Sequence, residues 1–230
     1  TTGTINPIIG ECNDGVLNDI RKPTITSKHI LEAIESADEN FLQGNVGAGT
    51  GMVCYDLKGG IGSASRIVEL GGEKFTVGVL VLSNFGSMED LMIRGNQIGG
   101  KIKEELEHAG DGKDKGSIIV ILATDIPLSS LQLKRLLKRT QSGIARTGGY
   151  TGNGSGEVAI GFTTANMVYH YEKNIFVNHK IIQEDLLDMV FKGTVEATEE
   201  AVLNSLISSN TVVGRKDRKI YSLRDFVKYL

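Results

Sequence analysis

Residues 115–125 read KGSIIVILATD. The unbroken apolar run from Ile118 to Ala123 predicts a strand in the core of the fold. The segment before it, residues 111–116, is polar, charged and rich in glycine and lysine, which is typical of a linker. Ser117 therefore stands where a linker enters a core strand, and we expect its hydroxyl at the mouth of that strand.

Paired strands with helices between or after them make up the rest of the pattern. Strands are expected over residues 52–57, 61–70, 74–82 and 158–164, and Gly71-Gly72 predicts a hairpin between the second and third. Helices are expected after Ser27, over 88–108, after Pro127, over 184–208 and over 222–230. Strict alternation of strand and helix is absent, so the order predicts an α+β fold with a largely antiparallel or mixed sheet.

Composition narrows the class of protein. The chain has 230 residues, 40% of them hydrophobic and 23% charged, which is ordinary for a globular protein and suits a single catalytic domain over 1–230. The formal net charge is −3 and no basic stripe is present, so we expect no nucleic-acid partner. No apolar run approaches the roughly 20 residues of a membrane span, so no membrane association is expected.

Three smaller features bear on processing and environment. Cys12 and Cys54 are interpreted as small buried hydrophobes rather than as a disulfide framework. The chain begins at Thr1 without methionine, and we expect it to be a fragment that lacks the N-terminal part of its fold. We expect a cytoplasmic protein, although the missing N-terminus leaves export open.

Cleavage of the Gly116–Ser117 bond would give Ser117 a new role. An N-terminal serine carries a nucleophile and a weak base, its α-amino group, on one residue. This arrangement is typical of the N-terminal nucleophile hydrolases. A Gly-Ser pair before a strand is more often only the end of a loop, so the interpretation needs support from elsewhere in the chain.

Two further segments offer that support. Ser155 and Glu157 lie two residues apart at the start of an expected strand, where both side chains would face the same way. The carboxylate could polarise the hydroxyl, although a turn serine and a solvated glutamate fit the spacing as well. Asn84 ends an apolar strand, where its amide could donate to an oxyanion or form a turn.

Other chemistries find little support. The glycine loop over residues 44–51 precedes a strand and lacks the Gly-Lys-Ser/Thr ending of a phosphate loop, so nucleotide binding is rejected. The four histidines, His29, His108, His170 and His179, are scattered and do not form a metal set. No cofactor is expected.

Together these segments resemble the DmpA-type aminopeptidases, which include the L-aminopeptidase/D-esterases and the β-peptidyl aminopeptidases. The resemblance covers nearly the whole chain, and its motifs occur in the family's order. The matching stretches are residues 7–15, 17–19, 44–52, 58–66, 79–86, 116–120, 123–125, 127–128, 145–148 and 155–157.

The resemblance implies that the precursor cuts itself between Gly116 and Ser117. Residues 1–116 then belong to a larger subunit, and residues 117–230 form a smaller subunit that begins with the nucleophile. The implied fold is an αββα sandwich like that of the N-terminal nucleophile hydrolases, with different strand connectivity. Homo-oligomers of processed subunit pairs are implied as the assembly, and small peptides, amides or esters as the substrates.

The resemblance also implies roles for further residues. Ser155 and Glu157 match the residues that assist the nucleophile, and Asn84 matches the oxyanion amide. Glu11 and Asn13 match a loop that lines the substrate pocket, but some family members carry an aromatic residue in place of Asn13.

Two alternatives stay open at this stage. An acyltransferase of the ornithine acetyltransferase type shares the logic of self-cleavage, but it uses a threonine where this chain has Ser117. An unprocessed relative without catalytic activity is the other alternative. Within the hydrolase interpretation the general base is undecided between the α-amine of Ser117 and Ser155 polarised by Glu157.

Overall fold

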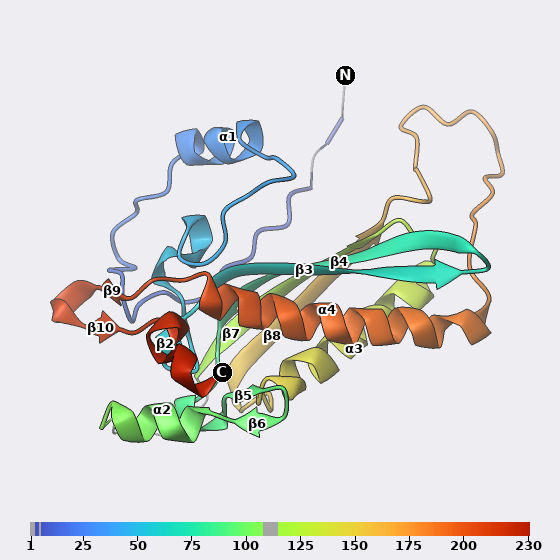
Figure 1. The fold of residues 1–230 in the computed structure, drawn as a ribbon. Coiled ribbons are helices and arrows are strands. Elements are labelled where there is room, and N and C mark those ends of the chain that lie inside the picture. The colour runs from blue at the N-terminus through green and yellow to red at the C-terminus, as the bar shows by residue number, and fades with distance from the viewer. Residues whose placement is uncertain (1–2, 5, 108–114) are drawn as a thin grey trace.

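A four-stranded mixed sheet forms the centre of the fold in the computed structural model, which describes residues 3–4, 6–107 and 115–230. Its strands are β3 (Gly60–Leu70), β4 (Glu73–Asn84), β7 (Lys115–Thr124) and β8 (Gly154–Thr163), and they lie side by side in that order. The β3–β4 and β4–β7 pairs are antiparallel and the β7–β8 pair is parallel. The predicted mixed sheet of an α+β fold is thereby confirmed (Figure 1).

Two long helices cover one face of this sheet. They are α3 (Ser130–Arg146) and α4 (Leu187–Ile207), which lie on the same side of the strands in Figure 1. Ile118, Val120 and Leu122 of β7 are fully buried in the core beneath them. Side chains alternate along a strand, so Ile119 and Ile121 point to the other face, where Ile121 is 37% exposed.

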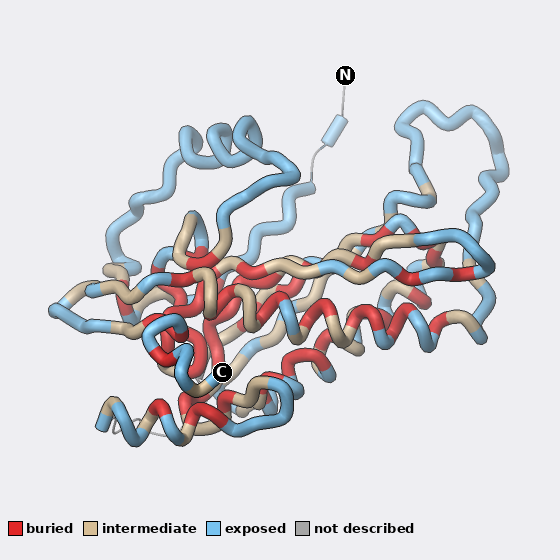
Figure 2. Tube along the Cα trace, viewed as in Figure 1, coloured by how far each residue is buried: buried red, intermediate tan, exposed pale blue. Residues whose placement is uncertain are grey.

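Shorter elements surround the sheet. They are the helices α1 (Ser27–Glu35) and α2 (Gly99–Glu105), the two-residue strands β1 (Val53–Cys54), β2 (Leu57–Lys58), β5 (Met92–Ile93), β6 (Asn96–Gln97), β9 (Val212–Val213) and β10 (Lys219–Ile220), and 3₁₀ turns at Gly47–Gly51, Met88–Asp90, Glu184–Leu186, Arg215–Asp217 and Leu223–Tyr229. Burial is concentrated along the sheet and α4, whereas α1 and the loop after β8 are exposed (Figure 2).

Several predicted elements occur where the sequence places them. The Gly71-Gly72 turn joins β3 and β4, and the helices after Pro127 and over 184–208 correspond to α3 and α4. Cys12 and Cys54 are both buried and are not joined in a disulfide, as predicted. The structure starts β8 at Gly154, four residues before the predicted strand, so Ser155 and Glu157 belong to the strand itself.

Two local predictions are wrong. Residues 88–108 were expected to form one helix, but the first half forms a 3₁₀ turn and the β5–β6 hairpin. Arg94 and Gly95 adopt positive φ angles of 52° and 78°, which a hairpin turn needs and a helix excludes. Residues 52–57 fold into the β1–β2 hairpin rather than one strand, because Tyr55 and Asp56 also have positive φ.

The helix after Ser27 forms, but its apolar face is not covered by the described residues. Ile30 and Ile34 are 58% and 67% exposed, and no residue of α1 is buried. The amphipathic pattern thus predicts the helix but not its packing.

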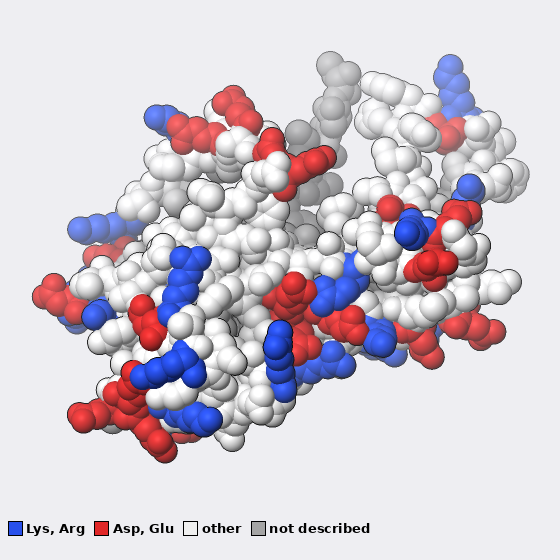
Figure 3. Space-filling model, in the orientation of Figure 1, with Lys and Arg blue, Asp and Glu red and all other residues white. Residues whose placement is uncertain are grey.

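No helix in the described ranges is long and apolar enough to cross a bilayer. On the face drawn in Figure 3, positive and negative side chains are interspersed.

The helix α4 packs closely on β3 at Gly62. A Cβ atom at this position would lie 2.0 Å from the backbone oxygen of Ala201 and 2.6 Å from the backbone nitrogen of Ser205, both in α4. Backbone atoms of a packed helix cannot shift cheaply, so only glycine allows this contact.

Gly62→Ala should therefore lower the free energy of unfolding by about 1–3 kcal/mol, the usual cost of overpacking. Gly78→Ala in β4 is the matched control, because its nearest neighbour, the backbone oxygen of Ala123, would be 3.7 Å from the new Cβ. Urea unfolding midpoints of the two variants measure the difference. Equal midpoints would show that α4 does not rest on β3 in this way.

Candidate active site

Asn84 and Ser117 lie directly opposite each other on neighbouring strands. Asn84 is the last residue of β4, and the antiparallel register pairs it with Ser117 near the start of β7. Directly opposed residues of an antiparallel pair point to the same face, so the amide and the hydroxyl are neighbours. Asn84 is buried and Ser117 is half-buried.

The amide of Asn84 is held in one orientation. Its Oδ1 accepts a hydrogen bond of 2.8 Å from the backbone N–H of Val53. Its Nδ2 is consequently turned the other way and donates to the backbone oxygen of Asn13 at 3.1 Å. An NH₂ group carries two hydrogens, so the bond to Asn13 leaves a second hydrogen of Nδ2 available as a donor.

Cys12 is a neighbour of Ser117 that the sequence indicates only as a buried hydrophobe. Burial raises the pKa of the Cys12 thiol, the nearby charge of Glu11 raises it further, and a hydrogen bond with the Ser117 side chain partly offsets the rise. The thiol is therefore protonated at neutral pH. It sits beside the hydroxyl as an uncharged group, between the two loop residues implied by the resemblance.

Gly116 fits a space that no other residue could occupy. A Cβ on Gly116 would lie 1.9 Å from the backbone oxygen of Asn84. The predicted cleavage bond is thus pressed against the end of β4, one residue from the Asn84–Ser117 pair. Residues 108–114, which make up most of the predicted linker, lie outside the described residues.

Ser155 and Glu157 form a second pair at the start of β8. The Ser155 hydroxyl donates to Oε1 of Glu157 at 3.1 Å. The parallel register places Ser155 beside Gly116 and Glu157 beside Ile118. Because Ile118 points to the helical layer, this pair lies on the face of the sheet toward α3, opposite to the side chain of Ser117.

The structure thus assembles the predicted residues in two groups around one peptide bond. Asn84 and Ser117 lie side by side on the face of the sheet away from the helices, which we call the open face, and Ser155 bonds Glu157 on the helical face. Gly116 is the backbone position that contacts both groups, through the Asn84 carbonyl on one side and through its pairing with Ser155 on the other.

The two residues of the predicted pocket loop differ in their surroundings. Glu11 is exposed and borders a groove of about 410 Å³ on the open face, which apolar side chains such as Ile9, Leu82 and Ile119 line. The Asn13 side chain is engaged in its own turn, where Oδ1 accepts from the Gly15 backbone at 2.9 Å. Its backbone oxygen accepts the hydrogen bond from Asn84.

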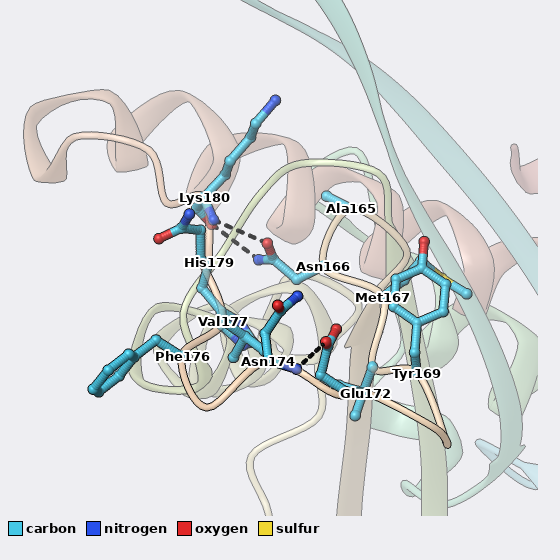
Figure 4. A pocket seen from close by; sticks show the side chains of 12 residues that line it. Ala165, Asn166, Met167, Tyr169, Glu172, Asn174, Phe176, Val177, His179 and Lys180 are labelled. Atoms are coloured by element: carbon cyan, nitrogen blue, oxygen red, sulfur yellow. Dashed lines mark hydrogen bonds between the residues drawn. The ribbon is translucent and has the colours of Figure 1, made fainter.

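A separate pocket, shown in Figure 4, lies within the loop of residues 165–180. Asn166 closes this loop by pairing with the backbone of Lys180, through contacts of 2.9 and 3.0 Å. None of the predicted site residues lines it.

The histidines that the structure describes make local contacts, and His179 lines the pocket within the loop of residues 165–180. His29 makes a local contact with Thr26 at the start of α1, and His170 packs on Tyr171, while His108 lies outside the described residues. Within residues 3–4, 6–107 and 115–230, no three His, Cys, Asp or Glu side chains are grouped so that they could hold a metal ion.

Sequence relatives of this chain are peptidases. It is 37% identical to the β-peptidyl aminopeptidase BapA of Sphingosinicella xenopeptidilytica over 94% of its length, and 39% identical to BapA of Sphingosinicella microcystinivorans over 90%. These matches span 57% and 56% of the relatives, so the chain covers little more than half of their length.

Solved structures show the same fold. The PH0078 protein of Pyrococcus horikoshii OT3 superimposes with a TM-score of 0.90 at 49% identity, covering 99% of this chain and 62% of that protein. The L-aminopeptidase D-Ala-esterase/amidase of Ochrobactrum anthropi, described as a variant of the Ntn hydrolase fold, gives 0.83 at 35% identity, with 94% and 62% covered. The predicted relation to the N-terminal nucleophile hydrolases is thereby confirmed.

The model of peptidase family S58 matches residues 1–220, which is nearly the whole chain. Together with the shared fold and the relatives above, this match shows that the chain belongs to peptidase family S58.

Proposed function

We propose that this chain is the catalytic part of a self-processing serine aminopeptidase, which releases N-terminal residues from peptides, amides or esters. The observation that carries the proposal is the pairing of Ser117 with Asn84, next to a glycine that no larger residue could replace. The names of the relatives, β-peptidyl aminopeptidase and L-aminopeptidase D-Ala-esterase/amidase, support the same class of substrate.

Self-cleavage is the first step of the proposed mechanism. The Ser117 hydroxyl oxygen attacks the carbonyl carbon of Gly116, and the C–N bond between the two residues breaks as an ester forms. The Ser117 nitrogen takes up the proton and becomes a free α-amine. Water then hydrolyses the ester, which leaves a carboxylate on Gly116 and a free hydroxyl on Ser117.

Turnover then uses the same hydroxyl on a substrate. Ser117 attacks the carbonyl of the N-terminal residue, and Nδ2 of Asn84 donates to the developing oxyanion. The hydroxyl proton passes to the α-amine, whose reference pKa is about 7.7–8.0, or to the Ser155 oxygen while the Ser155 hydrogen moves to Glu157. The same proton is then given to the leaving amine, which departs, and water hydrolyses the acyl-enzyme.

The position of Ser155 suits this second role. It lies beside Gly116 in the β7–β8 register, so a chain end created at Ser117 would have the Ser155 hydroxyl as its neighbour. Glu157 accepts a hydrogen bond of 3.1 Å from that hydroxyl and would orient it. In the uncut chain the Asn84–Ser117 pair and the Ser155–Glu157 pair lie on opposite faces of the sheet. After cleavage both pairs would adjoin the new N-terminus.

Ser117→Ala is expected to give one uncut chain without peptidase activity, because the attacking oxygen is gone. Intact-mass measurement of the purified variant, next to the parent protein, shows the state of the 116–117 bond. Two fragments from Ser117→Ala would refute self-cleavage by this residue.

Glu157→Gln is expected to lower kcat by about 10²–10⁴-fold, the usual contribution of a group that assists proton transfer. Steady-state kinetics with an amino-acid amide measure the loss, and circular dichroism checks the fold. Glu172→Gln, in the exposed loop after β8, serves as the control and should keep the parental rate. A normal kcat for Glu157→Gln would remove this carboxylate from the mechanism.

A further inference from the structure

Lys58 is a buried cation close to the candidate active site, and the mechanism above does not use it. It lies in β2 with no exposed surface. Its ammonium donates to three backbone oxygens, those of Gly49 and Met52 at 2.8 Å and that of Gly59 at 2.7 Å. Burial lowers the pKa of Lys58 to about 8, so the group is charged at neutral pH.

Such a site is costly to build. Burying a charge is unfavourable unless the group is fully hydrogen-bonded, and here the partners are neutral carbonyl groups. The three acceptors use all three hydrogens of the ammonium. The cage ties the glycine loop at residues 47–51 to the end of the β1–β2 hairpin.

One of the three oxygens connects Lys58 to Asn84. The Met52 oxygen accepts from the Lys58 ammonium and from the Gly59 N–H at 3.1 Å. The other end of the same peptide group is the Val53 N–H, which donates to Oδ1 of Asn84 at 2.8 Å. A single planar peptide therefore lies between the cation and the amide.

Charge effects pass through such a chain. Because the peptide is conjugated, a cation at its oxygen withdraws electron density from its nitrogen and makes the N–H a stronger donor. The Asn84 amide is conjugated in the same way, so a stronger bond at Oδ1 makes its Nδ2 hydrogens stronger donors. The surroundings are buried, which reduces the screening of these effects.

We infer that Lys58 is a positioning residue for the oxyanion amide, which orients and polarises Asn84 through the Met52–Val53 peptide group. The inference rests on the proposed function, because it assumes that Nδ2 of Asn84 faces the oxyanion. Lys58 itself touches neither the substrate nor Ser117. Its contribution belongs to the transition state, so it should appear in kcat rather than in KM.

A double-mutant cycle in the protein tests this inference. The variants are Lys58→Met, Asn84→Ala and the pair together, with kcat normalised to the processed fraction measured by intact mass. Asn84→Ala should lose about 10²–10³-fold in kcat. Lys58→Met should lose roughly two- to 150-fold, the range of couplings within one network, with little change in KM. The double variant should be no slower than Asn84→Ala alone.

Different failures have different meanings. If Asn84→Ala kept the kcat of the parent protein, the oxyanion assignment would be overturned, and the inference with it. Losses that multiply in the double variant would overturn the role of Lys58 alone and leave the proposed function intact. A rise in KM with unchanged kcat for Lys58→Met would do the same.

If Lys58→Met does not fold, a backbone substitution tests the peptide link to Asn84 on which the inference depends. Replacing Val53 by its α-hydroxy acid removes the N–H that links the peptide to Asn84 and keeps every side chain. The matched control is the same replacement at Tyr55, whose N–H donates to the Phe85 oxygen at 2.7 Å. A lower kcat at position 53 only is the expected result, and equal rates at both positions would overturn the inference.

Discussion

The antiparallel pairing of β4 with β7 is the constraint on which the site depends. It sets Asn84 opposite Ser117, and the carbonyl of Asn84 leaves no room for a side chain on Gly116. If β7 slipped by one residue against β4, the Ser117 side chain would face the helices, while the Asn84 side chain would stay on the opposite face. The apolar residues of β7 resist that slip, because Ile118, Val120 and Leu122 are buried against the helical layer.

The same sheet explains why cleavage and catalysis are linked in the proposed mechanism. In the continuous chain, Ser117 and Asn84 occupy the open face, while Ser155 and Glu157 occupy the face toward α3. A backbone amide at position 117 separates the two pairs. A chain end at that position would replace the amide by a free amine, flanked by β4 on one side and by β8 on the other.

Lys58 contributes to this site indirectly, through the orientation of the Asn84 side chain. The strands hold the Asn84 backbone in place, but they do not decide which end of its side-chain amide points to the substrate. The Val53 N–H decides this, and the Lys58 ammonium holds the peptide that carries it. The glycines around it, at 49 and 59, are backbone partners of the cation.

The sequence predicts the strands and the pairing of β3 with β4 because apolar periodicity and a Gly-Gly turn are local signals. It also places Asn84 at the end of its strand. Long-range register is not a local signal, so the facing of Ser117 and Asn84, and the opposite facing of Ser155 and Glu157, could not be predicted. The predicted helix does not form over residues 88–98, because Arg94 takes a positive φ that residue type does not predict.

Lys58 and Cys12 were missed as neighbours of the site for a similar reason. Nothing in a Lys-Gly-Gly segment shows that the lysine will be buried, since lysine is almost always exposed. Cys12 stands between Glu11 and Asn13, and that position was the available signal for its closeness to the site. Its contact with Ser117 depends on the folded loop.

One measurement tests the central claim most directly. The purified protein is mixed with an amino-acid ester, quenched in acid within milliseconds to seconds, and its fragments are analysed by mass spectrometry. The account predicts a fragment that begins at Ser117 and carries one acyl group on the Ser117 oxygen. An uncut chain, or an acyl group on Cys12 instead, would contradict it.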